Sequence, residues 1–144
     1  MKALTVRQPW ASLIVLGVKD VENRSWSAPA GIIGQRIAIH AGKTHNGNEF
    51  RSALITARWG GLPGDDEPNN TMRWIHAWWA NRDLPYGAVI GTAVVADCHQ
   101  CDGGCSPWAV RGRDWHWSLT DVTEAHDPVE MNGRLGLWEV STHG

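Results

Sequence analysis

Residues 17–26 read Gly17-Val18-Lys19-Asp20-Val21-Glu22-Asn23-Arg24-Ser25-Trp26 and place a lysine, a glutamate and an arginine in one short segment. Charged residues alternate there with Val21, Asn23 and Ser25, so an extended strand would put Glu22 and Arg24 on one face of a sheet. Buried charges are costly unless they pair or meet a ligand. The segment therefore indicates a ligand-binding cluster, a salt bridge that orders the chain locally, or a solvated sheet edge.

The preceding residues predict a strand and a short helix that lead into this segment. Residues 3–7 alternate like a strand, and Pro9 opens an apolar run over residues 10–16 that Gly17 stops. Proline at the first helical position and glycine just past the last are the usual punctuation of a helix. The resulting strand–helix–strand hairpin is expected to bring together five polar side chains, those of Arg7, Gln8, Lys19, Glu22 and Arg24.

These motifs resemble the ASCH domain (activating signal cointegrator homology), a family with a PUA-like fold. The family pattern is a strand ending in R-Q-P-[WY], an apolar helix, and then G-x-K-x-x-E-x-R. The first motif stands here as Arg7-Gln8-Pro9-Trp10, and the second as Gly17, Lys19, Glu22 and Arg24. Residues 116–140 also resemble the family's C-terminal end. The resemblance thus covers both ends of a single domain over residues 1–144, with a variable loop-and-helix insertion expected at about residues 44–83.

Strand count, turn spacing and helices in the first half predict an α+β domain built round a small β-barrel with helices packed at its side, and the resemblance implies that this barrel is PUA-like. At 144 residues, about 70% of the unfolded surface would be buried in such a domain. A bulge is expected at Gly91, and residues 60–70 are a loop rich in Gly, Pro, Asp and Asn. Further strands are predicted over residues 35–41, 87–98, 116–122 and 137–141, and helices over residues 47–59 and 72–81, the second capped by Asn70 or Thr71.

Composition sets the expected compartment. No apolar run approaches the roughly 20 residues of a membrane span, and the N-terminal residues lack the apolar core of a signal peptide. Three cysteines cannot all pair within one chain, which fits a reducing compartment. We therefore expect a cytoplasmic protein without a membrane partner; the sequence leaves its oligomeric state open.

Charge is unevenly distributed along the chain. The net charge is -2, but residues 1–60 carry eight Lys/Arg against three Asp/Glu (+5), whereas residues 61–144 carry five against twelve (-7). Ten tryptophans also exceed what a core of this size readily buries, so two or three should be partly exposed. A basic patch is one interpretation and dispersed solubilising charge the other; the patch would comprise Arg7, Lys19, Arg24, Arg36, Lys43, Arg51 and Arg58.

We expect a binding module for RNA or a modified nucleoside, with a basic, tryptophan-lined cleft. Lys19 and Arg24 would hold phosphate, Glu22 would accept a hydrogen bond from an exocyclic amine, and a tryptophan would stack on the base. The low net charge favours short single strands or a nucleoside over long RNA. The expected lining residues are Arg7, Gln8, Trp10, Lys19, Glu22, Arg24, Trp26, His40 and His99.

Two other functions remain open. The first is a small hydrolase acting on an acylated cytidine or on single-stranded RNA, with Lys19 and Glu22 as the reacting pair and His40 or His99 assisting. The resembled family includes amidohydrolases that deacetylate N4-acetylcytidine with a lysine, a threonine three residues later and a distant glutamate; here Glu22 stands in place of that threonine. The second is a protein-interaction module that docks through the Trp-rich residues 72–79.

The cysteines raise the question of a metal. Cys98 and Cys101 have C-x-x-C spacing, Cys105 follows, and His99 or His116 could supply a fourth zinc ligand. A second C-x-x-C pair, which would make this pattern specific, is lacking, and Cys98 ends a predicted buried strand where a small apolar side chain is simply packed. No cofactor is otherwise expected; the zinc interpretation rests on Cys98, Cys101, Cys105 and His116.

Overall fold

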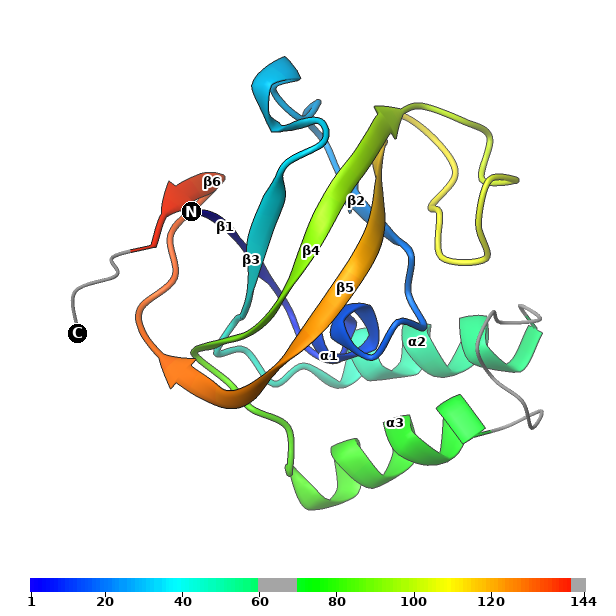
Figure 1. Ribbon diagram of the computed structural model, residues 1–144. Coiled ribbons are helices and arrows are strands. Elements are labelled where there is room, and N and C mark those ends of the chain that lie inside the picture. Colours follow the sequence, from blue (N-terminus) through cyan, green and yellow to red (C-terminus); the bar gives the residue numbers. More distant parts are fainter. Residues whose placement is uncertain (60–69, 141–144) are drawn as a thin grey trace.

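A curled six-stranded sheet forms the centre of the molecule in the computed structural model, which describes residues 1–59 and 70–140 (Figure 1). The strand order is β2-β5-β4-β3-β1-β6; β1 and β3 run parallel and all other neighbours antiparallel. The strands are β1 (Lys2–Val6), β2 (Val21–Arg24), β3 (Arg36–Ala41), β4 (Ala88–His99), β5 (Trp115–Glu130) and β6 (Leu137–Glu139). The helices are α1 (Trp10–Val15), the 3₁₀ turn η1 (Ala30–Ile32), α2 (Gly47–Trp59) and α3 (Asn70–Asn81). This half-barrel with helices at its side is the PUA-like α+β architecture that the sequence predicts.

The end of α1 follows from Gly17. Its φ of +80° is a left-handed conformation that glycine adopts without a side-chain penalty. The N–H of Gly17 donates to the carbonyl of Ile14 at 2.9 Å, and that of Val18 donates to the carbonyl of Leu13 at 3.0 Å. This is a Schellman cap, which turns the chain out of α1 and into β2.

The start of α1 differs slightly from the prediction. The helix begins at Trp10, so Pro9 occupies the N-cap position rather than the first helical position. Proline has no side-chain oxygen with which to cap, and Gln8 takes over that role. The Gln8 Oε1 accepts a hydrogen bond from the backbone N–H of Ser12 at 3.0 Å, which satisfies one of the free donors of the first turn.

Gly91 lets α1 lie against the sheet. A Cβ at this position would come within 2.5 Å of the carbonyl oxygen of Thr123 and 2.7 Å of the Val15 Cγ1. The pairing of β4 with β5 shifts register on both sides of Gly91, which confirms the expected bulge. The main core, including Ile39 and Trp117, lies where α1 meets the sheet.

Helices α2 and α3 form a further layer beneath α1. Figure 1 shows them lying side by side, with α1 between them and the strands. Phe50 and Ala53 of α2 and Ile75 of α3 are buried together with Leu13 of α1 in a second apolar cluster. The helices therefore attach to the sheet through α1.

Some element boundaries differ from the predictions. β5 extends to Glu130, whereas the prediction ended it at residue 122, where the alternating pattern stops. Asp121 has a φ of +48°, which bends the strand, but pairing with β4 continues beyond this bend to Glu130. α3 begins at Asn70, and β6 ends at Glu139 rather than residue 141. The predicted loop falls almost wholly on residues 60–69, outside the described part of the chain.

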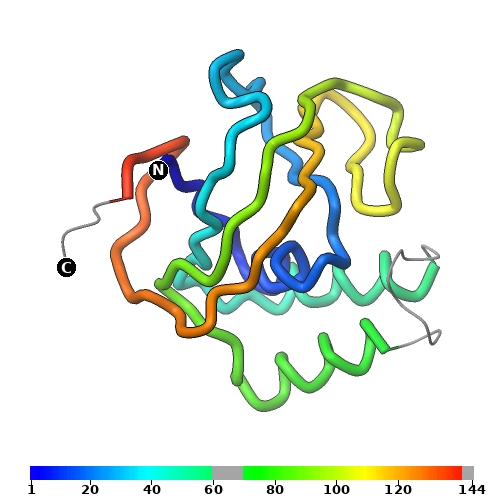
Figure 2. Tube along the Cα trace, viewed as in Figure 1, coloured from blue at the N-terminus to red at the C-terminus, as the bar shows by residue number. Residues whose placement is uncertain are grey.

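The connection between β4 and β5 is a long loop over residues 100–114. Figure 2 shows it, in yellow, leaving the end of the sheet where β4 ends and β5 begins. It contains Cys101 and Cys105 as well as Trp108. Among the helices of the described residues, none is long and apolar enough to cross a membrane.

Candidate functional site

A cleft of about 1210 Å³ opens between the end of β1, strand β2, helix α2 and three loop segments, residues 42–44, 107–110 and 132–136. Small-molecule sites commonly occupy roughly 300–1,000 Å³, so this cleft has room for a nucleoside and part of a neighbouring nucleotide. Its lining comprises Thr5, Val6, Arg7, Trp10, Lys19, residues 22–26, His40, residues 42–44, Glu49, Ser52, Thr56, residues 107–110 and residues 132–136.

Lys19, Glu22 and Arg24 form an ion cluster in the cleft wall. The Lys19 Nζ lies 3.0 Å from Glu22 Oε1 and also donates to the carbonyl of Val21. The Arg24 Nη2 lies 2.9 Å from the other carboxylate oxygen, Oε2, and donates to the carbonyl of Thr5 at 2.7 Å. Lys19 and Glu22 are almost fully buried. Of the three interpretations of the charged segment, a solvated edge is therefore excluded.

The electrostatics of the ion cluster favour an anion. Burial by itself raises the pKa of Glu22, but the charges and hydrogen bonds of Lys19 and Arg24 outweigh it and hold that pKa below its usual value of 4.5. Glu22 is therefore ionised at neutral pH. Two cations against one carboxylate leave one excess positive charge at the wall of the cleft.

Tryptophan rings border the ion cluster. The Trp10 Nε1 donates to Glu49 Oε2 at 2.6 Å, which ties the start of α1 to α2, and the Lys19 Nζ lies 5.8 Å from the centroid of the Trp10 ring. Trp108 meets Trp10 edge to face, with centroids 6.0 Å apart. Trp26 makes a similar contact with the buried Trp117 at 5.0 Å. The cleft thus offers aromatic surface beside positive charge.

Residues 107–110 form one wall of the cleft and are held by β2. The Asn23 side chain donates to the Trp108 carbonyl and accepts from the Val110 N–H, both at 2.9 Å. The Trp108 Nε1 is buried and has no hydrogen-bond partner in the described part of the chain. Trp108 is a lining residue outside the predicted set, and its only signal in the sequence is a single tryptophan within the mostly polar residues 100–114.

The cleft is basic although the whole chain is slightly acidic. Five lining residues are Lys or Arg and two are Glu (Glu22 and Glu49), a net charge of +3. Arg134 belongs to this set and was not in the predicted basic patch; it stands in a turn whose place in the fold the sequence does not reveal. Arg36, by contrast, pairs with Asp121 at 2.5 Å and does not line the cleft. The five cations are Arg7, Lys19, Arg24, Lys43 and Arg134.

Gln8 does not line the cleft, contrary to expectation. It is fully buried, and its Nε2 donates to the Ser12 hydroxyl and to the Pro85 carbonyl, both at 2.8 Å. Together with the hydrogen bond that caps α1, these contacts use the whole side-chain amide. Its role is to join α1 to the residues that precede β4.

His40 lines the cleft, but both ring nitrogens are engaged. The Nε2 lies 2.7 Å from the Met131 carbonyl, which can only accept, so Nε2 carries the proton. The Nδ1 then accepts from the Thr5 hydroxyl at 3.2 Å, and that hydroxyl accepts from Trp138 Nε1 at 3.1 Å. In this arrangement His40 positions Thr5 and the chain around Met131 and has no ring nitrogen left for a substrate.

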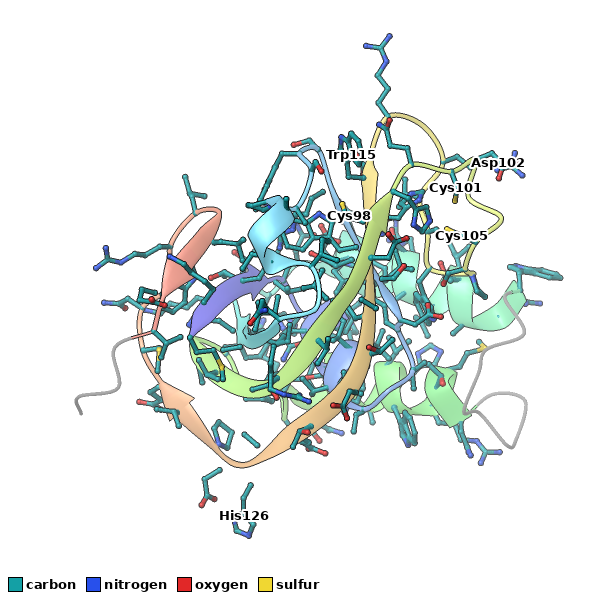
Figure 3. All side chains as sticks on the ribbon, turned by 45° about the horizontal axis from the view of Figure 1, so that its top comes forward. Cys98, Cys101, Asp102, Cys105, Trp115 and His126 are labelled. Carbon is teal, nitrogen blue, oxygen red and sulfur yellow. The ribbon has the colours of Figure 1, made fainter. Side chains whose placement is uncertain are left out.

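His99 lies outside the cleft, in a cluster with Cys101, Cys105 and His116, and their potential ligand atoms all lie within 4.8 Å of one another. Cys98 is not part of this cluster. Its Sγ accepts a hydrogen bond from the Ala28 N–H at 3.3 Å. Figure 3 shows Cys101 and Cys105 together in the loop and Cys98 apart from them. The predicted zinc set therefore changes by one residue, because adjacent residues of a strand point to opposite faces.

Comparison with known proteins agrees with this architecture. The family model of the ASCH domain matches residues 4–128. Activating signal cointegrator 1 of Mus musculus is 34% identical over 97 residues, which are 66% of this chain and 14% of that protein, so the chain spans a small part of its relative.

Solved structures with the same fold include ASCH from Zymomonas mobilis, with a TM-score of 0.55 and 15% sequence identity over 98% of this chain and 87% of that one. A serine-to-alanine and a tyrosine-to-phenylalanine variant of that protein give TM-scores of 0.53 and 0.54 at 16% identity; both cover 98% of this chain, and 88% and 90% of their own. At such identities the likeness concerns the fold.

Proposed function

The chain belongs to the ASCH domain family, and on that premise we propose that it binds short single-stranded RNA or a modified nucleoside in the basic cleft. Family membership supports an RNA-binding module in general terms. The observation that carries the specific proposal is the charge of +3 in a cleft that also presents tryptophan rings, on a chain whose net charge is -2. Phosphate electrostatics and base stacking are the two main contributions to single-strand binding.

The parts of the cleft suit different parts of a nucleotide. Arg24 has one guanidinium nitrogen, Nη1, without a hydrogen-bond partner among the described residues, and it is the natural donor to a phosphate near the ion cluster. Lys43 and Arg134 are exposed on the rim, where a second phosphate would lie. Trp10 and Trp26 are half-buried, so each offers part of a ring to a base. Glu22 is engaged with both cations, which makes hydrogen bonding to an exocyclic amine the weakest of the predicted contacts.

The rim cations provide the test. If three net charges are neutralised, log K for a short RNA should fall with log[salt] with a slope of about -2, from about 0.7 per phosphate contact. Lys43→Gln and Arg134→Gln should each weaken binding and reduce that slope by about 0.7, measured by fluorescence anisotropy.

The matched control is Arg51→Gln, since Arg51 is an exposed cation on α2 that does not line the cleft. Equal losses in the control and in the rim variants would contradict a specific cleft. Absence of RNA and nucleoside binding by the unmodified protein would overturn the proposal.

One observation favours a hydrolase acting on an acylated cytidine or on RNA. Lys19 is almost fully buried, yet it lines the cleft beside the ionised Glu22. A catalytic base needs a carboxylate oxygen that is free to accept a proton, and each oxygen of Glu22 is already paired with a cation. Binding of a ligand has no such requirement. An assay with acylated cytidine and labelled RNA separates the two functions. Product formation lost in Lys19→Ala would establish an enzyme; binding without product would establish a binding module.

The protein-interaction alternative has one supporting observation on α3. Trp74 and Trp79 of the Trp-rich segment are 39% and 43% exposed, so a partner protein could contact both rings. Trp74→Ala should leave RNA affinity unchanged if the cleft is the binding site. Loss of RNA binding in this variant would instead place the interaction on α3.

A further inference from the structure

We propose that His99, Cys101, Cys105 and His116 bind a structural zinc ion that fixes the β4–β5 loop. Cys101 and Cys105 belong to that loop, while His99 and His116 are cross-strand partners in the pairing of β4 with β5. Antiparallel pairing therefore sets the two imidazoles side by side, and the loop folds back to bring the two thiols to them. The four-residue set joins both strands and the loop at one point.

The distances suit a tetrahedral ion. With Zn–N near 2.0–2.1 Å and Zn–S near 2.3 Å, a nitrogen and a sulfur ligand of one zinc lie about 3.5 Å apart. The His116 Nδ1 lies 3.3 Å from the Cys101 Sγ and 3.6 Å from the Cys105 Sγ. The two sulfurs are 2.6 Å apart and would separate by about 1 Å on binding. Cys105 is exposed and lies on a loop, so this movement requires no change in the strands.

Both histidines already have the hydrogen bonds that zinc ligands usually have. The His116 Nε2 lies 2.7 Å from the Val110 carbonyl, so this nitrogen carries the proton and Nδ1 turns its lone pair toward the thiols. The His99 Nδ1 donates to Asp97 Oδ2 at 2.7 Å, which leaves its Nε2 for a metal. Metal-bound histidines characteristically donate the other ring N–H to a carboxylate or a backbone carbonyl.

The donor set also indicates the metal. Two thiolates and two imidazoles in a tetrahedral arrangement favour zinc, and two thiolates would neutralise its charge. All four positions are filled by the protein, as in structural sites, with none left for a substrate. The backbone N–H of Gly103 donates to the Cys101 Sγ at 3.3 Å and stabilises the turn between the two cysteines.

Metal analysis of the purified protein tests the proposal. We expect about one zinc per chain in the unmodified protein, loss of zinc in Cys101→Ser and Cys105→Ser, and full retention in Cys98→Ser. Cys98 is the matched control because it adjoins the cluster in sequence but bonds to Ala28 instead. A protein purified under reducing conditions that contains no zinc and takes up none when it is added would overturn the proposal.

Two further measurements cover variants that fail to fold. Cobalt added to the unmodified protein should give the visible absorption of tetrahedral Co²⁺ together with thiolate charge-transfer bands; octahedral Co²⁺ spectra would contradict the site. Asp97→Asn, which alters a positioning residue, should weaken zinc affinity by about 10- to 100-fold in a chelator competition. An intact mass two hydrogens short, with Cys101 joined to Cys105, would show a disulfide in place of the metal.

Discussion

The carboxylate of Glu22 pairs with two cations at once, so substitution of this residue would leave both cations without their counter-ion. Its carboxylate balances Lys19, which is almost fully buried, and Arg24, which is partly accessible. The family-like pattern of Lys19, Glu22 and Arg24 thus produces an ordered, charged wall with one excess positive charge. The same cluster serves as scaffold and as electrostatic surface, so the two interpretations of this segment are not exclusive.

Replacement of Glu22 by glutamine should destabilise the protein by about 3–5 kcal/mol at pH 7, because it leaves Lys19 buried without a counter-ion. The pKa of Glu22 is lowered in the folded state, so its contribution is present above pH 4.5 and is lost as the pH falls through the folded-state pKa. The stability difference between the two proteins should therefore narrow below pH 4.5. Urea unfolding at pH 7 and at a series of acidic pH values measures it.

The control for this prediction is Glu130→Gln, an exposed carboxylate at the end of β5. Its stability should follow that of the unmodified protein at each pH. A stability difference for Glu22→Gln that stays constant down to strongly acid pH would show that the charge of Glu22 contributes nothing.

At the scale of the elements, α1 controls how the helices meet the sheet. Its side chains enter both apolar clusters, Ile14 and Val15 on the sheet side and Leu13 on the side of α2 and α3. Helix α1 can pack this closely against β4 only because Gly91 has no side chain. A bulge residue inside a strand is therefore also a packing residue for a helix.

Gly91→Ala should destabilise the protein by about 1–3 kcal/mol, because its Cβ would overlap the backbone carbonyl of Thr123 and the Val15 side chain. Gly31→Ala is the matched control, since a Cβ there meets nothing within 4 Å. Thermal and urea unfolding of both variants should show a large effect at Gly91 and an effect within about 0.5 kcal/mol at Gly31. Equal effects at both positions would contradict the packing argument.

At the scale of the whole molecule, the β4–β5 loop connects the proposed zinc site to the proposed binding cleft. His116 donates to the carbonyl of Val110, and Val110 lines the cleft. Asn23 of β2 accepts from the N–H of the same Val110, and the hydroxyl of Ser106, which directly precedes the wall, donates to Asp20 at 2.5 Å. The wall is therefore held from β2 and from the Cys/His cluster together.

Removal of zinc by a chelator should lower the melting temperature and weaken RNA binding several-fold, because the β4–β5 loop, which carries residues 107–110, would no longer be fixed by the ion to His99 and His116. Addition of zinc in excess over the chelator should restore both properties. Circular dichroism and anisotropy on the same samples provide the readouts. RNA affinity that is unchanged after confirmed zinc loss would show that the contacts from β2 hold the wall without help.

Local elements and the charge pattern can be predicted from the sequence of this chain. Pro9 and Gly17 bracket α1, the alternation over residues 21–24 puts Glu22 and Arg24 on one face, and the helix over residues 47–59 follows its periodicity. These features depend on contacts within a few residues, which local sequence encodes. The overall architecture could be predicted because the ASCH motifs identify a family with a known arrangement of these elements.

Which distant groups meet depends on the packing of the whole fold. The register of β4 and β5 paired His99 with His116 and turned Cys98 away, and the course of the β4–β5 loop put Trp108 in the cleft. Arg134 likewise entered the cleft from a segment far along the chain. A strand register or a loop path is fixed by many weak contacts summed over the whole core, so no short stretch of sequence contains it.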